Sequence, residues 1–466
     1  MIELLDRQES LTANQWKIFV AALLSTMLDF FDFFLISFVL AFIFRDWHLT
    51  YGQSAAVLFS SGIAAVPAGW FFGWLGDRIG RRKVFITTIL IFSFATGVMA
   101  FAPSGAWLFL TVMRFIVGLG VGGMTVVDQT LLQEFVPARK RGFIAGLSLA
   151  LLPAGTLLAS ILSSSLGPVI GWRGLFAIGL LPAGMAFVIR MWVPESPRWL
   201  VREGRLEEAR RSLAWALQID PAKITLPTLT PAPERTSWLE LFRYPRSIAV
   251  SCLTGLAQTG SVGLQLWLIT LLVLVLKKTP AEASFLAIWI NLIGMVGRVL
   301  GAWMSDALGR RVGGMVTALA SAVAMWLAGY LYDQSLAGVS VFYLLLLVQS
   351  LCNNSNLAVV FPYMAEVWPA SLRASGFGLA YGTSNLGKFI GPAGLAVIAG
   401  ASNLMSPGAT VAAIVPAFGY FASWYVLGAL VFIVLGIETR GRTFEELDRS
   451  FKLPRRQSPT VGAVEG

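Results

Sequence analysis

Two acidic side chains, Asp29 and Asp32, stand inside the first long apolar run of the sequence. A separation of three residues corresponds to about 300° of helical rotation, so both carboxyl groups lie on one side of a helix. Burial and the repulsion between like charges both favour the protonated form of a carboxyl group. The pair therefore indicates a site that takes up and releases a proton. In the alternative interpretation, Asp29 faces the mouth of a pore or bonds a neighbouring helix.

Lys388 stands about halfway along a later apolar run, in the string Asn385-Leu386-Gly387-Lys388-Phe389, and that run contains no acidic residue. An ammonium group in apolar surroundings requires an anion. Two partners fit it, namely the carboxylate of a bound organic anion or one of the aspartates of the first run. We expect an organic anion to bind Lys388, with Asn385 beside it.

The overall composition explains what surrounds these charges. Hydrophobic residues make up 56% of the 466 residues and charged residues only 13%, about half the charged share of a soluble domain. An apolar run of about 20 residues is long enough to cross a bilayer as a helix. The sequence therefore predicts an all-α membrane protein with twelve transmembrane helices. The twelve runs are 17–44, 54–76, 84–102, 106–130, 142–166, 172–193, 247–276, 282–304, 313–332, 338–364, 375–399 and 411–436.

Two motifs recur half a chain apart. The string around Asp77 returns around Asp306, 229 residues later, and the string Glu-x-x-Pro-x-x-x-Arg at Glu134 returns at Glu366, 232 residues later. The repeats predict two pseudo-symmetric six-helix bundles, and paired halves around a central site are the architecture of alternating-access transporters. The expected segments are an N-terminal bundle over 1–193, a cytoplasmic linker with short helices over 194–246, a C-terminal bundle over 247–436 and a cytoplasmic tail over 437–466.

Lysine and arginine gather in alternate loops, and short loops rich in cations stay in the cytoplasm. Both termini are therefore expected in the cytoplasm, with the chain in the cytoplasmic (inner) membrane. The net charge of +10 is assigned to these loops, which face anionic lipid headgroups, so no nucleic-acid binding is expected. The cations of the inner loops are Arg78, Arg81, Arg82, Lys83, Arg139, Lys140, Arg141, Arg310, Arg311 and Arg373.

Other chemistry is limited by what the sequence contains. His48 is the only histidine, and the two cysteines, Cys252 and Cys352, lie in separate apolar runs. This count excludes a histidine proton relay and indicates neither a metal site nor a disulfide framework. We find no nucleophile–base pair and no phosphate-binding loop in a suitable context. We expect no enzymatic activity, no metal and no cofactor, and we expect a monomer.

These motifs resemble those of the major facilitator superfamily over nearly the whole chain. The string 73–83 resembles the superfamily signature between helices 2 and 3, and Arg114-x-x-x-Gly-x-Gly-x-Gly resembles its helix 4 signature. The strings Pro-Glu-Ser-Pro-Arg-Trp-Leu at 194–200 and Glu-Thr-Arg-Gly-Arg-Thr at 438–443 resemble signatures of the sugar-porter branch and of its metabolite:H+ and aromatic-acid:H+ symporter relatives.

The resemblance implies partners for several residues. In sugar porters a helix 1 aspartate pairs with the helix 4 arginine, which corresponds here to Asp32 and Arg114, and protonation of Asp32 would release Arg114. The alternative is a permanent ion pair that fixes helix packing. In this superfamily helices 1, 4, 7 and 10 line the cavity, so amides there are expected to bind substrate or, alternatively, to bond neighbouring helices. The amides assigned to the site are Gln258, Gln265, Asn353 and Asn354.

The repeated charges suggest a gate at the cytoplasmic edge, where charge-assisted bonds can latch one access state. Glu134 with Arg141, and Glu366 with Arg373, are expected to form equivalent contacts in the two halves, and Arg298 is assigned to the same gate. The alternative is a static staple between loops. The remaining residues assigned to the gate are Asp77, Arg81, Arg82, Asp306 and Arg310.

The expected function is proton-coupled symport of a small organic anion by alternating access. The segment 258–265 lacks the Gln-Gln-x-Ser-Gly-x-Asn pattern of hexose binding, which makes a sugar or polyol the second candidate. A receptor that binds without transport and a membrane enzyme are less favoured alternatives. The expected partners are the small molecule, protons and the lipid bilayer.

Overall fold

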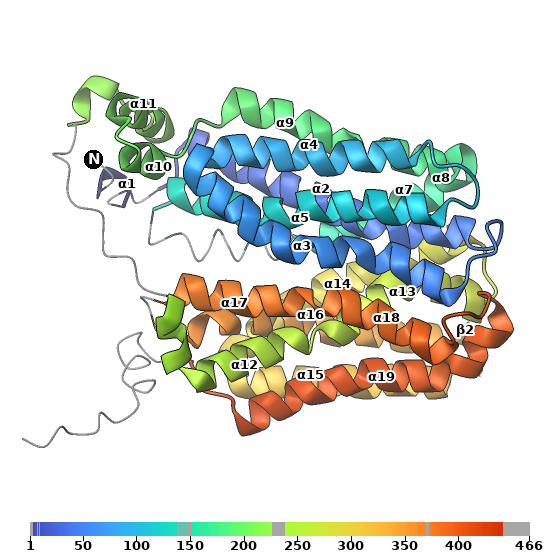
Figure 1. Cartoon of the computed structure of the whole chain (residues 1–466). Helices are drawn as coiled ribbons and strands as arrows, with labels where there is room; N and C mark the ends of the chain where they lie inside the picture. Colours follow the sequence, from blue (N-terminus) through green and yellow to red (C-terminus); the bar gives the residue numbers. More distant parts are fainter. Residues whose placement is uncertain are drawn as a thin grey trace, which may run out of the picture.

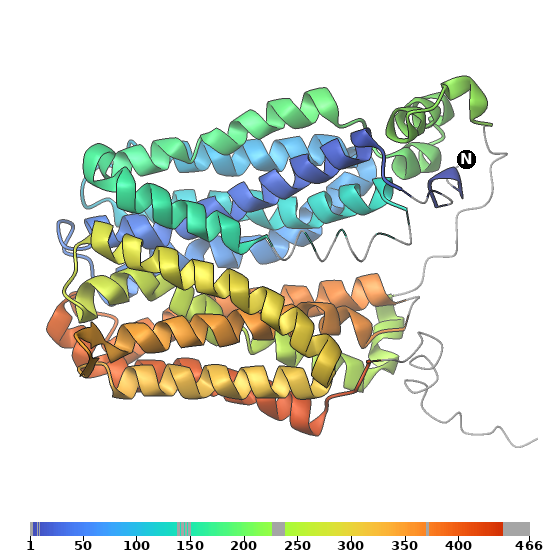
Figure 2. The same ribbon diagram turned by 180° about the vertical axis from the view of Figure 1, so that it is seen from behind.

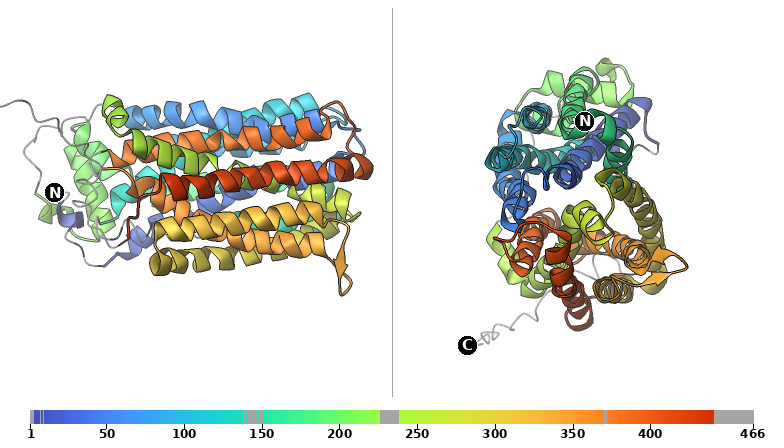
Figure 3. Two further views of the ribbon diagram at one scale, coloured as in Figure 1. Left: turned by 90° about the horizontal axis from the view of Figure 1, so that it is seen from below. Right: turned by 90° about the vertical axis from the view of Figure 1, so that its right-hand side faces the viewer.

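The computed structural model describes residues 3–6, 8, 10–137, 140, 144, 147, 151–225, 238–369 and 372–440. Long helices form two groups that lie one above the other in Figure 1, blue to green above and yellow-green to red below. The end-on view in Figure 3 shows the same two groups along the helix axes. Within the described residues, ten helical spans are long and apolar enough to cross a membrane. The predicted all-α membrane fold is confirmed.

The first group of helices follows the first six apolar runs. Thr12 and Thr50 each close a capping box with a glutamine three residues later, which fixes where the first two long helices begin. Residues 142–150 of the fifth run lie largely outside the described part of the chain, and its remainder forms a helix. The elements are α1 (Glu3–Asp6), α2 (Ala13–Ile43), α3 (Tyr51–Ile79), α4 (Arg81–Met99), α5 (Trp107–Phe135), α7 (Pro153–Ser165), α8 (Gly167–Ile178) and α9 (Leu181–Trp192).

The second group repeats this plan. A capping box of Thr279 with Glu282 begins its longest helix. The elements are α12 (Pro245–Leu256), α13 (Thr259–Val275), α14 (Pro280–Leu308), α15 (Arg310–Tyr330), α16 (Val341–Glu366), α17 (Arg373–Asn385), α18 (Gly387–Ala399) and α19 (Pro407–Val434).

Three of the predicted spans are interrupted. The run 247–276 is divided between α12 and α13, and the run 375–399 is divided between α17 and α18 at Leu386. The run 172–193 is divided between α8 and α9, and Gly171 adds a non-helical kink to α8 with φ of 64°. Interrupted helices place main-chain polar groups at membrane depth, which is tolerated where protein or a cavity covers them.

The two ends of the helices differ. The end that carries Asp77 and Asp306, here called the basic end, also holds α10 (Pro197–Arg202), α11 (Leu206–Leu217) and the short helices η2 (Pro221–Lys223) and η3 (Trp238–Arg243). Figure 2 shows α10, α11 and the start of the chain together at this end. The opposite end carries a hairpin in which β1 (Ser335–Leu336) pairs antiparallel with β2 (Val339–Ser340).

At the opposite end the two groups are joined through their main chains. The N–H groups of Tyr51 and Gly52 donate to the carbonyls of Asn403 and Ala401 at 3.1 and 2.9 Å, and Met405 donates to Leu49 at 3.1 Å. Along the same interface α2 packs on α13, α3 on α18 and α7 on α14. The structure is therefore closed at the end opposite the basic end.

Candidate functional site

Three carboxyl groups are buried in the first group of helices. Asp29 and Asp32 on α2 are 3% and 0% exposed, and Asp128 on α5 is 1% exposed. At least one carboxyl oxygen of each has no hydrogen-bond partner. Asp29 and Asp32 are expected from the sequence, whereas Asp128 is not among the predicted site residues. The sequence contains the information needed to identify Asp128, because an acidic residue inside the apolar run 106–130 is itself a candidate functional residue.

Arg114 on α5 reaches α2 and α3 from inside this group. Its Nη1 donates to the main-chain carbonyl of Asp32 at 3.2 Å, and its Nη2 donates to the carbonyl of Phe33 at 2.8 Å and to Ser61 Oγ at 2.9 Å. No hydrogen bond joins Arg114 to the Asp32 carboxyl group, although the two charges attract each other, so the expected pairing stays a prediction. The guanidinium group therefore donates hydrogen bonds to two carbonyls and a hydroxyl. Its role in proton coupling stays a prediction.

Lys388 lies at the junction of the two groups. Its Nζ stands 4.7 Å from the centre of the Phe33 ring, and its backbone passes so close to α3 that a Cβ on Gly62 would meet it. The charged group that interacts with Lys388 is Asp29. Asp29 is one of the two partners that the sequence left open, and the choice between it and a substrate carboxylate stays a prediction.

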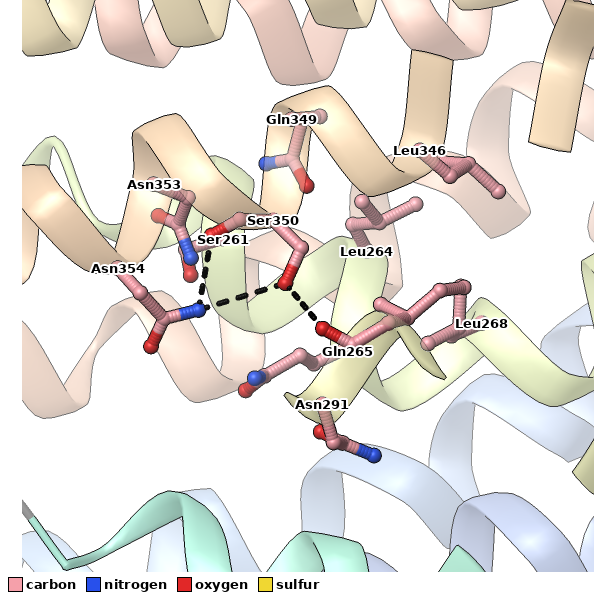
Figure 4. Close-up of a pocket in the computed structure, with 11 residues that line it drawn as sticks. Ser261, Leu264, Gln265, Leu268, Asn291, Leu346, Gln349, Ser350, Asn353 and Asn354 are labelled. Carbon is pink, nitrogen blue, oxygen red and sulfur yellow. Dashed lines mark hydrogen bonds between the residues drawn. The ribbon is translucent and has the colours of Figure 1, made fainter. Parts of the chain in front are cut away.

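A narrow polar pocket lies in the second group, between α13, α14 and α16. Figure 4 shows its amide side chains, with Asn354 bonded to Ser350 and Ser350 bonded to the main chain of α14. Of the amides expected to bind substrate, Gln265, Asn353 and Asn354 line this pocket. Its lining residues are Ser261, Leu264, Gln265, Leu268, Ile290, Asn291, Leu346, Gln349, Ser350, Asn353 and Asn354.

Three other residues assigned to the substrate site do not line this pocket. Gln258 donates to Asn356 at 3.1 Å, so it bonds a neighbouring helix, as the alternative interpretation of the amides held. Asn385 is the last residue of α17, and Lys388 follows on α18. Gln349, which the sequence analysis did not single out, donates to Tyr425, whose hydroxyl donates to Asn353.

Arg298 stands next to the pocket. It is 8% exposed, and its Nε donates to Asn354 Oδ1 at 3.2 Å. From the sequence, this arginine is expected at the gate, because it lies only eight residues before Asp306. The structure instead brings it to a wall of the pocket, since Gly294 and Gly297 let α14 pack closely on α16. A guanidinium thus lies one hydrogen bond away from the pocket amides.

In the first group the repeated charges meet around Arg81. Its Nη2 lies 2.6 Å from Asp77 Oδ1, and its Nε lies 3.6 Å from Glu134 Oε1. Arg202 of α10 contacts the same Asp77 carboxylate at 3.3 Å. The N–H of Arg82 donates to Glu195. Arg141, the expected partner of Glu134, lies outside the described residues.

The second group repeats this arrangement around Arg310. Its Nη1 lies 3.0 Å from Asp306 Oδ1, and its Nε lies 3.2 Å from Glu366 Oε2. Thr439 donates to the same glutamate at 2.6 Å. Arg373, the expected partner of Glu366, begins α17. In each half, then, the two repeated motifs contact each other, and these ion pairs join helices of one half.

Transport proteins are among the relatives that match this chain over most of its length. The niacin transporter NiaP of Acinetobacter baylyi is 31% identical over 435 residues, which cover 91% of this chain and 94% of that protein. The cis,cis-muconate transport protein of the same organism is 26% identical, with 86% and 91% covered. The 4-hydroxybenzoate transporter PcaK of Pseudomonas putida is 26% identical, with 82% and 86% covered.

Solved structures share the fold. The xylose transporter XylE from E. coli in a partially occluded inward-open conformation has a TM-score of 0.71 at 21% identity, covering 93% of this chain and 100% of that chain. A bacterial homologue of the human lysosomal transporter Spinster also has a TM-score of 0.71, at 16% identity, with 92% and 98% covered. The resemblance to the major facilitator superfamily is confirmed. Because the family model described as sugar (and other) transporter matches residues 17–451, this chain belongs to that family of membrane transporters.

Proposed function

We propose that this transporter carries a small organic carboxylate together with a proton across the cytoplasmic membrane. The three relatives described above are named for niacin, muconate and 4-hydroxybenzoate, all of which carry a carboxyl group that is ionised at neutral pH. Their similarity to this chain extends over most of its length. An anion of this class is therefore the substrate that the relatives favour.

The observation that carries the proposal is the amide-lined pocket with Arg298 beside it. A guanidinium presents two parallel N–H donors that match the two oxygens of a carboxylate. Arg298 already donates to Asn354 on the pocket wall, and Gln265 and Asn353 line the same space. We assign the substrate carboxylate to Arg298 and Asn354, and the remaining polar atoms of the substrate to the other amides.

In this proposal, the residues that bind the coupled proton lie in the first group of helices. Asp29 interacts with Lys388 across the junction of the two groups, and Asp32 is fully buried beside it on α2. A proton on Asp29 would cancel its attraction to Lys388 and so weaken the side-chain interaction that links α2 of one half to α18 of the other. Proton binding is thereby linked to the relative position of the two halves.

The ion-pair networks fit a role in keeping each half rigid while the halves move. We place the basic end and both termini in the cytoplasm, since cations concentrate there. With the opposite end closed by main-chain hydrogen bonds, the pocket in this arrangement would open toward the cytoplasm. Breaking the Arg310–Glu366 pair would then loosen the second half at the basic end without touching substrate.

The test uses purified full-length protein in proteoliposomes. Radiolabelled nicotinate is supplied outside, with the interior more alkaline, and accumulation above the outside concentration is the expected result. Dissipating the pH gradient with a protonophore should reduce uptake to equilibration. Xylose and glucose are tested in parallel, because the family also contains sugar transporters. Accumulation of a sugar but not of nicotinate, benzoate or muconate would overturn the substrate assignment.

Two pocket variants locate the site. Arg298→Gln removes the cation and Gln265→Leu removes an amide of similar size, while Gln334→Leu changes an exposed amide of the β-hairpin region as a matched control. Loss of a hydrogen bond to a charged group weakens binding by about 1.5–3 kcal/mol, roughly 10- to 150-fold. We expect this increase in the KM for nicotinate with Arg298→Gln and a smaller one with Gln265→Leu. Equal KM values for all three variants would contradict the assignment.

A further inference from the structure

Asp128 is a buried carboxyl group that the proposed function does not use. It lies on α5, is 1% exposed and contacts α2 through Thr26, whose Oγ1 lies 2.5 Å from Asp128 Oδ2. The other oxygen, Oδ1, is buried without a hydrogen-bond partner. An ionised carboxylate needs donors at both oxygens, so this arrangement suits a carboxyl group that carries its own proton.

Counting hydrogens at Thr26 supports the same conclusion. The Thr26 hydroxyl lies 2.9 Å from the carbonyl of Ala22, one helical turn earlier, as well as beside Asp128. A carbonyl oxygen can only accept, and a hydroxyl has one hydrogen to donate. If that hydrogen goes to Ala22, the hydrogen between Thr26 and Asp128 must come from the carboxyl group. Both contacts are satisfied together only when Asp128 is protonated.

The charges around Asp128 also favour the neutral acid. Asp29, one turn beyond Thr26 on α2, interacts electrostatically with Asp128, and none of the ion pairs among the described residues includes Asp128. Two carboxyl groups that interact in a buried site share a proton more readily than both ionise. The other elements that pack against α5 carry their charges at the basic end, namely Asp77 and Arg78 on α3, Arg81, Arg82 and Lys83 on α4, and Arg198 and Arg202 on α10.

The position of Asp128 along the helices places it between Asp29 and the basic end. Helix α2 begins at the basic end, where Thr12 and Asn14 bond α11. Thr26, the partner of Asp128, therefore lies about 4.5 Å nearer to that end than Asp29. Glu134, in the ion-pair network of the basic end, follows Asp128 on α5 by about 9 Å of helix. The carboxyl groups form a series from the basic end toward Lys388.

From this geometry we propose that Asp128 is a second proton-binding residue, which passes the coupling proton between Asp29 and the basic end. The proton leaves the Asp128 oxygen for Asp29, Asp128 becomes a carboxylate that accepts the Thr26 hydroxyl, and a proton from the basic end restores the acid. The inference rests on the proposed proton coupling. Its first test, however, requires neither transport nor a known substrate.

The first experiment detects the protonated acid directly. Infrared spectra of purified protein in lipid at neutral pH, in H2O and in 2H2O, should show the carbonyl stretching band of a buried carboxylic acid. The band should lose intensity in Asp128→Asn, whose amide can still donate to Thr26, and should persist in Asp46→Asn, an exposed aspartate of the loop after α2. Spectra of wild type and Asp128→Asn that agree in this band would overturn the protonated state.

The second experiment asks whether that proton moves. Proteoliposomes with Asp128→Asn should exchange labelled for unlabelled nicotinate at a rate near that of wild type, but should accumulate it at least tenfold less under an imposed pH gradient. Asp46→Asn should accumulate it normally. Full accumulation by Asp128→Asn would show a proton that stays in place and would overturn the relay. Absence of nicotinate transport by wild type, with the infrared band intact, would instead contradict the proposed substrate alone.

Discussion

At the scale of single residues, the repeated Gly-Arg-Arg strings have a reason in backbone geometry. Gly80 has φ of 107° and ψ of 149°, and Gly309 has φ of 88° and ψ of 164°, a region essentially restricted to glycine. Beside each glycine, a glutamate accepts hydrogen bonds from the first N–H groups of the next helix, Glu195 at α4 and Glu438 at α15. Carboxylates are favourable at helix N-termini. The repeated strings therefore fix two tight corners of the basic end.

We predict that Gly309→Ala destabilises the protein by about 1–3 kcal/mol, the usual cost of a residue held in a sparsely populated backbone region. A Cβ at this position would also stand 2.6 Å from Glu438 Oε2 and displace that carboxylate. Thermal unfolding in detergent, followed by intrinsic fluorescence, measures the loss. Gly419→Ala, in α19 with no atom within 4 Å of its added Cβ, is the control and should unfold near the wild-type temperature.

The charges in apolar runs were visible in the sequence, but their partners were not. Asp29, Asp32 and Lys388 could be identified because burial of a charge needs a functional or structural reason. Arg114 donates a hydrogen bond to the main-chain carbonyl of Asp32 and none to its carboxyl group. This choice depends on how the helices are rotated about their axes, which the sequence alone does not determine. The same holds for Arg298, whose approach to Asn354 results from the close packing of α14 on α16.

At the scale of elements, the junction between α3 and α18 is closed by a close backbone approach. Gly62 of α3 lies against Lys388 of α18, where an added Cβ would stand 2.5 Å from Cβ and 3.1 Å from the carbonyl carbon of the lysine. Phe59 and Phe389 meet edge to face one turn along, with ring centres 4.8 Å apart. Small residues permit such approach between membrane helices. Helix α3 can therefore seat on α18 only while position 62 lacks a side chain.

We predict that Gly62→Ala separates α3 from α18 and opens the end opposite the basic end. Spin labels are attached at His48→Cys and Leu404→Cys, in a background with Cys252→Ser and Cys352→Ser. Double electron–electron resonance then measures the distance between the two labels across that end. The variant should populate longer distances than the parent. Gly69→Ala on the same helix, whose added Cβ would make only an ordinary 3.5 Å contact with Val126, should leave the distribution unchanged. Identical distributions for both variants would contradict the prediction.

The helical spans followed from hydrophobicity, whereas their interruptions did not. Run 17–44 corresponds to α2 (Ala13–Ile43), and run 411–436 corresponds to α19 (Pro407–Val434), within a few residues. The divisions at Leu386 and between α12 and α13 occur inside runs that are apolar overall, although Asn385, Lys388 and Gln258 stand beside the two breaks. A hydrophobic pattern reports that a segment is buried in lipid or protein. It does not report where tertiary packing replaces helical hydrogen bonds.

At the scale of the whole molecule, the duplication predicted paired halves but not which end is closed. That choice depends on a small free-energy difference between access states, since a few hydrogen bonds suffice to reverse it. In this structure Asn291 of α14 joins the two groups. It accepts from Thr156 at 3.0 Å and donates to Ser160 at 2.9 Å, both on α7. Asn291 also lines the polar pocket, so one side chain belongs to the junction and to the substrate site.

We predict that removing the two α7 hydroxyls shifts the whole molecule toward the state that is open at the opposite end. Thr156→Val with Ser160→Ala deletes two hydrogen bonds, each of net value about 0.5–1.5 kcal/mol, so the population ratio should change by roughly 5- to 150-fold. The spin-label pair at positions 48 and 404 should move to longer distances, while labels on Lys83→Cys and Val312→Cys at the basic end should move closer together.

Ser164→Ala is the matched control, because Ser164 lies on the same helix and bonds only its own turn, at Ile161. Opposite movements at the two ends are the signature of two halves that rock around a central pocket, and a local loosening of α7 would change neither pair in that way. Longer distances at both ends, or at neither, would therefore contradict the rocking motion itself. Because the two deleted hydroxyls bond Asn291, which lines the pocket, the KM for nicotinate exchange is measured as well, and an unchanged KM separates a shift in access from damage to the binding site.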